Sequence, residues 1–126
     1  MTEEILGRLV DCFYARVRGD ELIGPLFNAA VSNWPEHLEK LTAFWSSVML
    51  TSGRYKGNPM AAHLRHASQI EPAMFGRWLE LWRETAREML DEESAAAIVA
   101  KADRIAESLQ LGLFFRLPSQ RGGAAA

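Results

Sequence analysis

Three histidines, two tyrosines and four tryptophans are the residues of this 126-residue chain whose types best suit chemistry. A neutral imidazole can bind a metal through one ring nitrogen, while tyrosine and tryptophan place a hydrogen-bond donor at the edge of an apolar ring. A small helical core needs few such rings, so their number suggests a wide pocket. A stripe of methionine and tryptophan at helical spacing is more often plain core, and periodicity alone leaves both interpretations open.

His63 follows a loop rich in glycine and proline, and its neighbours Met60, Ala61, Ala62 and Leu64 are small or apolar. A short helix at this place can present an imidazole to a metal. The alternative is a surface or half-buried histidine bonded to a backbone carbonyl, which is the commoner role of an arbitrary histidine. The residues around His63 do not decide between the two.

The other two histidines are weaker candidates for a metal ligand. His66 lies one turn after His63 and can compete with it, while His37 lies on the apolar face of a separate predicted helix. No histidine pair has the spacing of a zinc site, and Cys12 is the only cysteine, which argues against structural zinc. The chain also lacks a glycine-rich phosphate loop and a Gly-x-Ser-x-Gly nucleophile turn.

Composition narrows the class of protein. Hydrophobic residues make up 48% of the chain and charged residues 24%, which argues against disordered and fibrous proteins. The net charge of -2 comes without the basic cluster of a nucleic-acid-binding protein. No apolar run is long enough to span a membrane, and the acidic start Met1-Thr2-Glu3-Glu4 is unlike a signal peptide. We therefore expect a cytoplasmic protein without nucleic-acid or membrane partners, its lone Cys12 reduced and buried.

The first half of the chain predicts two long helices. Apolar residues recur at three-to-four spacing between Ile5 and Val17, and Gly19-Asp20 ends this helix. Gly24-Pro25 then predicts a tight corner that buries the next two residues, Leu26 and Phe27. Asn33 can cap the second long helix, with Pro35 in its first turn and Glu36 at the capping-box position. One face of that helix carries His37, Leu41, Phe44, Trp45 and Val48.

The second half predicts a loop and three further helices. The loop covers residues 52–59, and residues 60–66 form only a short helix, which carries His63. A helix that opens near Glu71-Pro72 buries the stripe Phe75, Trp78, Leu79, Trp82 and Met89. The last helix begins at Asp91 or Ser94 and buries Ile98, Val99, Ala102, Ile105, Ala106, Leu109 and Leu113. The fold class is therefore all-α, with one domain over residues 1–117 and a disordered tail over residues 118–126.

Five segments, taken in their order along the chain, resemble the third group of the truncated haemoglobins, a family of small globin-like haem proteins. They are residues 13–18, residues 24–27, His37 with Phe44-Trp45, residues 55–63 and residues 75–79. Beyond residue 79 only the helical pattern supports the match. The first two groups usually carry glycine pairs after their early helices, whereas the only such pair here is Gly122-Gly123. That difference favours the third group.

The resemblance implies a truncated globin fold, a two-on-two helical sandwich around haem b (iron protoporphyrin IX). It assigns His63 as the proximal iron ligand, and Tyr14, His37 and Trp78 as the residues that face a bound ligand on the distal side. Leu41 would lie over the porphyrin and also face that ligand. The remaining expected cofactor contacts are Phe44, Trp45 and Tyr55. Basic residues near Tyr55 face either the haem propionates or solvent: Arg54, Lys56 and Arg65.

The implied function is the binding of O2, NO, CO or cyanide at a pentacoordinate or weakly hexacoordinate iron, with Tyr14 and Trp78 as hydrogen-bond donors. His37 is a gate, a sixth iron ligand or a partly exposed bystander. Two function classes follow, a reversible binder of diatomic gases and an enzyme such as an NO dioxygenase or peroxidase, the latter with a possible reductase partner. A non-haem helical interaction domain is the alternative.

Overall fold

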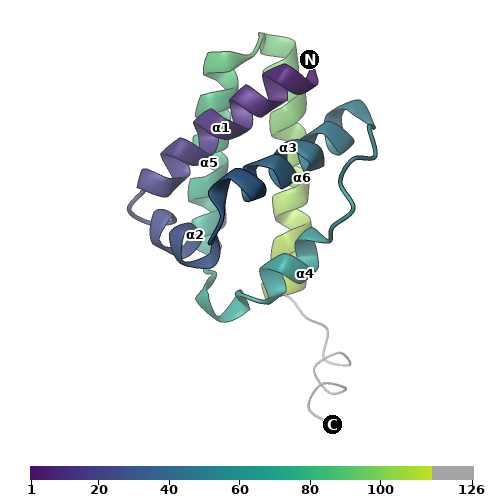
Figure 1. The fold of residues 1–126 in the computed structure, drawn as a ribbon. Coiled ribbons are helices and arrows are strands. Elements are labelled where there is room, and N and C mark those ends of the chain that lie inside the picture. Colours follow the sequence, from purple (N-terminus) through teal and green to yellow (C-terminus); the bar gives the residue numbers. More distant parts are fainter. Residues whose placement is uncertain (115–126) are drawn as a thin grey trace.

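The computed structural model describes residues 1–114 of the chain as helices joined by short connections (Figure 1). In chain order they are α1 (Glu3–Gly19), α2 (Gly24–Ala30), α3 (Trp34–Leu50), α4 (Pro59–Leu64), a 3-10 turn (Ala67–Gln69), α5 (Pro72–Met89) and α6 (Glu92–Phe114). No strand occurs within residues 1–114, so the predicted all-α class is confirmed. The predicted tail over residues 118–126 lies outside the described residues.

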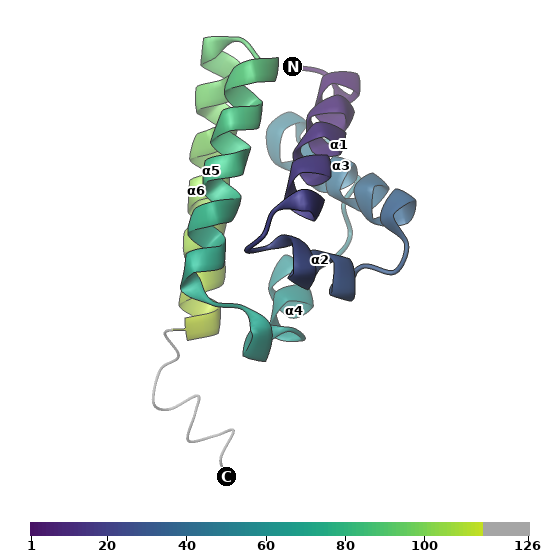
Figure 2. The ribbon, with the colours of Figure 1, turned by 90° about the vertical axis from the view of Figure 1, so that its left-hand side faces the viewer.

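Four long helices form two layers. Helices α5 and α6 lie side by side in one layer, and α1 and α3 form the other (Figure 2). The core between the layers is lined by fully buried side chains of α1, α3, α5 and α6. Both short helices, α2 and α4, lie at the end of the sandwich opposite the N-terminus (Figures 1 and 2). This arrangement is the expected sandwich of two helices on two. No helix in the described part is both long and apolar enough to cross a membrane.

Side-chain caps begin α1 and α3, two of the helices that carry the candidate site. Thr2 Oγ1 accepts a hydrogen bond from the Ile5 amide (3.2 Å) at the start of α1. Asn33 Oδ1 accepts from the Glu36 amide (3.1 Å), which confirms the predicted cap of α3. Each bond satisfies an amide that the first turn of a helix leaves unpaired.

Residues 24–30 form a helix, where the sequence predicted only a tight corner with two buried apolar residues. Leu26 and Phe27 are half-buried, and it is Gly24 that is buried. A Cβ at Gly24 would lie 2.9 Å from the Arg18 carbonyl oxygen, so α2 can follow α1 this closely only with glycine there. Pro25 in the first turn favours continuation as a helix, since its ring fixes φ at a helical value.

Other predictions of burial and of helix ends were also wrong. Met89 is 38% exposed because it is the last residue of α5, and Leu81 is buried in the stripe instead. Cys12 is only half-buried. Helix α4 covers Pro59–Leu64 rather than residues 60–66, and His66 falls between α4 and the 3-10 turn.

Candidate functional site

His63 is held in one orientation by the backbone of its own helix. Its Nδ1 lies 2.7 Å from the Pro59 carbonyl oxygen, one turn earlier in α4. A carbonyl only accepts hydrogen bonds, so in the neutral ring the proton is on Nδ1 and the lone pair is on Nε2. The ring is half-buried and stacks at 6.4 Å and 26° on Phe75 of α5. The sequence left a metal ligand and a carbonyl-bonded histidine as alternatives, but this bond is compatible with both roles.

Helix α4 itself is fixed at its start and on one side. Asn58 Oδ1 accepts from the Ala61 amide (3.2 Å), and Pro59 occupies the first turn. On the side of α6, a Cβ at Gly112 would come within 2.6 Å of Met60 Sδ. Glycine at this position thus allows α6 to pack directly on Met60, one turn before His63.

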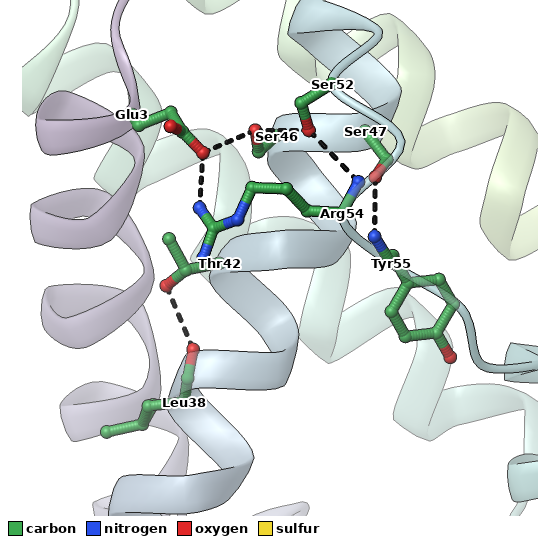
Figure 3. Close-up of polar contacts among 8 residues, drawn as sticks. All are labelled: Glu3, Leu38, Thr42, Ser46, Ser47, Ser52, Arg54 and Tyr55. Carbon is green, nitrogen blue, oxygen red and sulfur yellow. Dashed lines mark hydrogen bonds and ion pairs between the residues drawn. The ribbon is translucent and has the colours of Figure 1, made fainter.

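The loop that leads to α4 is bound to α3 through Tyr55. The Tyr55 amide donates to Ser47 Oγ (2.9 Å; Figure 3). The Tyr55 ring packs edge-on against Phe44 at 5.2 Å. Burial raises the pKa of the Tyr55 hydroxyl above its ordinary value. Two of the expected cofactor residues, Phe44 and Tyr55, therefore contact each other.

A polar cluster connects the same loop to α1. The buried Ser46 hydroxyl donates to Glu3 Oε1 (2.8 Å) and shares a second hydrogen bond with Ser52 Oγ (2.7 Å) (Figure 3). Arg54 forms an ion pair with Glu3, and this pair, followed by the Ser46 bond, holds the pKa of the Glu3 carboxyl below its ordinary value. Neither interpretation of Arg54 from the sequence foresaw this contact, because Glu3 is 51 residues away.

Tyr14 is the most buried of the three residues predicted to face a bound ligand. It is 4% exposed on α1, and its ring is 6.3 Å from the His37 ring, at 84°. Burial raises the pKa of the Tyr14 hydroxyl to about 12, although a hydrogen bond with the Trp78 side chain opposes the rise. The structure therefore brings Tyr14, His37 and Trp78 together from α1, α3 and α5.

His37 is half-buried near the start of α3. Burial lowers its pKa, and the nearby Lys40 lowers it further, so the imidazole is neutral at physiological pH. A neutral imidazole is able to act in any of the roles left open for it.

Trp34 is a neighbour of Tyr14 and His37 that the sequence analysis missed. Its ring lies 5.6 Å from that of His37 and 6.1 Å from that of Tyr14, and the Arg18 guanidinium stacks on it at 4.6 Å. Trp34 also lines an open surface groove of about 710 Å³, together with Ala15, Arg18, Gly19, Asn28 and Val31. The available signal was its position three residues before His37, which places both on one helix face.

The remaining expected pocket residues follow His37 along α3. Leu41 and Phe44 are half-buried. Trp45 is only 1% exposed and stacks on Trp82 of α5 at 4.6 Å. Leu41 and Phe44 thus have surface to offer a cofactor, whereas Trp45 supports them from within the core. Contact of Leu41, Phe44 and Trp45 with a cofactor stays a prediction.

Comparison with known proteins gives one clear relationship, although no protein-family model matches the chain. The chain is 32% identical over 118 residues to the group 3 truncated haemoglobin ctb of Campylobacter jejuni, an alignment that covers 90% of this chain and 92% of that protein. The crystal structure of the group III truncated haemoglobin from Campylobacter jejuni superposes with a TM-score of 0.81 at the same identity and coverage. The chain belongs to the group 3 truncated haemoglobins. Membership confirms the predicted family and its fold.

The buried hydroxyl of Tyr14 should make this truncated haemoglobin less stable at alkaline pH. Below the ordinary pKa of 10.0 both folded and unfolded chains hold the proton, so the contribution of Tyr14 is complete. As pH rises toward about 12, the unfolded chain loses the phenolic proton of Tyr14 before the folded chain does. The free energy of unfolding therefore falls by up to roughly 2–3 kcal/mol. Urea unfolding of wild type and Tyr14→Phe from about pH 9 to about pH 11, at equal haem loading, measures how the free energy of unfolding changes with pH. Identical pH dependence in both proteins would show a solvated hydroxyl.

Proposed function

We propose that this truncated haemoglobin binds haem b through His63 Nε2 and holds a diatomic gas, O2, NO, CO or cyanide, beside Tyr14, Trp78 and His37. The observation that carries the proposal is the 2.7 Å hydrogen bond from His63 Nδ1 to the Pro59 carbonyl. It makes Nε2 the free, basic nitrogen of a half-buried ring, which is how proximal histidines are oriented by a second hydrogen-bonding partner. The named relative, a truncated haemoglobin, supports the same assignment.

Partly exposed apolar side chains on the elements that carry the candidate site suit an apolar macrocycle. Half-buried apolar side chains are available on three elements: Leu41 and Phe44 on α3, Met60 on α4, and Met74 and Leu79 on α5. Such side chains gain free energy when an apolar surface covers what they leave exposed. When bound, the haem supplies an iron atom whose open coordination position takes the gas.

Tyr14 and Trp78 supply the hydrogen-bond donors of the distal side. A pKa of about 12 keeps the Tyr14 hydroxyl protonated at physiological pH, and an indole N–H can only donate. Each donor directed at a polarised diatomic ligand contributes about 1 kcal/mol. Since they come from α1 and α5, the two layers of the sandwich jointly hold the ligand.

His37 completes the distal side without a charge. Its neutral ring would border the ligand position as a wall or gate in a pentacoordinate protein, and its nitrogen would serve as a weak sixth ligand in a hexacoordinate one. The 6.3 Å separation from Tyr14 supports the first arrangement, in which both rings border the same space.

A second candidate function is an oxidative enzyme, an NO dioxygenase or a peroxidase, supplied with electrons by a reductase. The observation that favours it is the pair of donors, because a gas held this firmly stays until a second reactant arrives. We also propose a cytoplasmic location, which the single half-buried Cys12 supports. The non-haem interaction domain weighed from the sequence has no support from the relative.

Replacement of His63 tests the proposed cofactor. His63→Ala should lose haem, seen as loss of the Soret band after gel filtration, because no other donor replaces Nε2. His66→Ala is the matched control, since His66 lies three residues on outside α4, and it should keep the band. If the His66 variant loses haem while the His63 variant retains it, the assignment of the ligand is reversed.

Replacement of the two donors tests the distal side. Tyr14→Phe and Trp78→Phe should each raise the O2 dissociation rate, about tenfold if each removes roughly 1.4 kcal/mol. Because Tyr14 and Trp78 interact with each other, the double variant should show a non-additive effect. Stopped-flow release of O2 from the four proteins measures both. Unchanged rates in both single variants would refute the donor role while leaving haem binding by His63 intact.

A further inference from the structure

Three of the four tryptophans form a continuous stack between the helix layers. Trp78 and Trp82, one turn apart on α5, lie 5.6 Å apart with an angle of 4° between their rings. Trp82 and Trp45 of α3 lie 4.6 Å apart at 20°. Trp82 and Trp45 are 0% and 1% exposed. The stack therefore leads from Trp78 on α5 through the fully buried Trp82 to Trp45 on α3, in the opposite layer.

Two more aromatic rings extend this stack to the loop before α4. Trp45 meets Phe44 at 5.4 Å, and Phe44 meets Tyr55 at 5.2 Å. Tyr55 is half-buried on the loop that Figure 3 shows, where its amide is held by Ser47. At the other end, Phe13 packs edge-on against both Trp78 (5.4 Å) and Tyr14 (4.7 Å). Redox-active indole and phenol rings thus lie at both ends of the chain of contacts.

Trp82 has a property that suits transfer rather than storage of charge. Among residues 1–114 its Nε1 is the one buried side-chain polar atom without a hydrogen-bond partner. An indole that loses an electron becomes a strong acid, but no protein acceptor among residues 1–114 bonds to this N–H to take the proton. An oxidised Trp82 therefore stays a cation radical and keeps a high potential. It regains an electron from a neighbour instead of settling as a stable neutral radical.

We infer that Trp78, Trp82 and Trp45 form a relay that carries oxidising equivalents from the distal pocket to Tyr55, where a small reductant consumes them. The inference rests on the proposed haem function, with hydrogen peroxide as the oxidant. It supplies the peroxidase alternative with a route by which reductants too large for the pocket are oxidised at the loop.

The electrons and atoms of the route balance. Hydrogen peroxide takes two electrons and two protons and leaves as two waters. Each electron comes from Trp78, which is refilled in turn through Trp82, Trp45 and Tyr55, and Tyr55 releases its phenolic proton to water. A hydrogen-atom donor such as ascorbate or a phenol returns one electron and one proton to the Tyr55 radical. Two such donors are oxidised for each peroxide, and the protein ends unchanged.

Radical trapping tests the relay directly. The haem-loaded protein is treated with stoichiometric hydrogen peroxide and a nitroso spin trap, and trap adducts are mapped by peptide mass spectrometry per peroxide consumed. Wild type should carry its main adduct on Tyr55. Trp82→Phe keeps an apolar ring in the core but removes one oxidisable position, which leaves a second step across a phenylalanine like the one at Phe44. The Tyr55 adduct should therefore fall well below the wild-type level, and adducts should gather on Tyr14 and Trp78.

Two further variants keep the test decisive. Met89→Leu removes an oxidisable side chain that is exposed at the end of α5, outside the stack and the site, and it should leave the Tyr55 adduct unchanged. Tyr55→Phe leaves the core untouched and should move the adduct back to Trp45, which makes the test independent of whether the Trp82 variant folds. Main adducts on Cys12, or equal losses in the Met89 and Trp82 variants, would overturn the relay. Normal Soret and CO spectra in the same samples show that the proposed haem function stands when the relay fails.

Discussion

The hydrogen bond between His63 Nδ1 and the Pro59 carbonyl is the contact on which the rest of the site depends. It requires α4 to be formed, because its two partners lie one turn apart in that helix. Helix α4 in turn depends on the Asn58 cap, on proline at the first position, and on the close approach of α6 that Gly112 allows. A helix of only six residues is not stable by itself, so these contacts supply the stability that the other helices gain from their greater length.

The opposite side of the site is part of the core. Tyr14 is almost wholly buried and packs against Phe13, Phe27 and Trp34, yet it also carries the hydroxyl expected to meet the ligand. Burial alone raises its pKa, and the result is a donor that stays protonated across the physiological range. Stability and function therefore constrain the same side chain, since a change at Tyr14 alters the packing of α1 as well as the polarity of the pocket.

Local signals in the sequence predicted most of the fold. The three-to-four spacing from Ile5 to Val17 and the cap at Asn33 gave the two long helices, because both signals act within one or two turns. Leu26 and Phe27 were misplaced because glycine and proline mark a turn or a helix start equally well. The order of motifs around Tyr14, His37, His63 and Trp78 was enough to infer the family.

What could not be predicted depends on contacts between distant segments. The Glu3 pair with Arg54 and the stacking of Trp45 on Trp82 join residues more than thirty positions apart, and no local spacing encodes them. The same holds for the neighbourhood of Tyr14 and Trp78, which both pack edge-on against Phe13. The order of motifs placed the two residues on one side of the cofactor without showing this shared contact.

Resonance Raman spectroscopy of the ferrous protein tests the central claim, that the neutral His63 ring presents Nε2 to haem iron. The wild-type spectrum should contain an iron–histidine stretching band that shifts on iron-isotope substitution. His63→Gly should lose this band, and added imidazole should restore it by filling the space that the side chain leaves. A band that persists in His63→Gly without imidazole would mean that another residue binds the iron, and it would contradict the account.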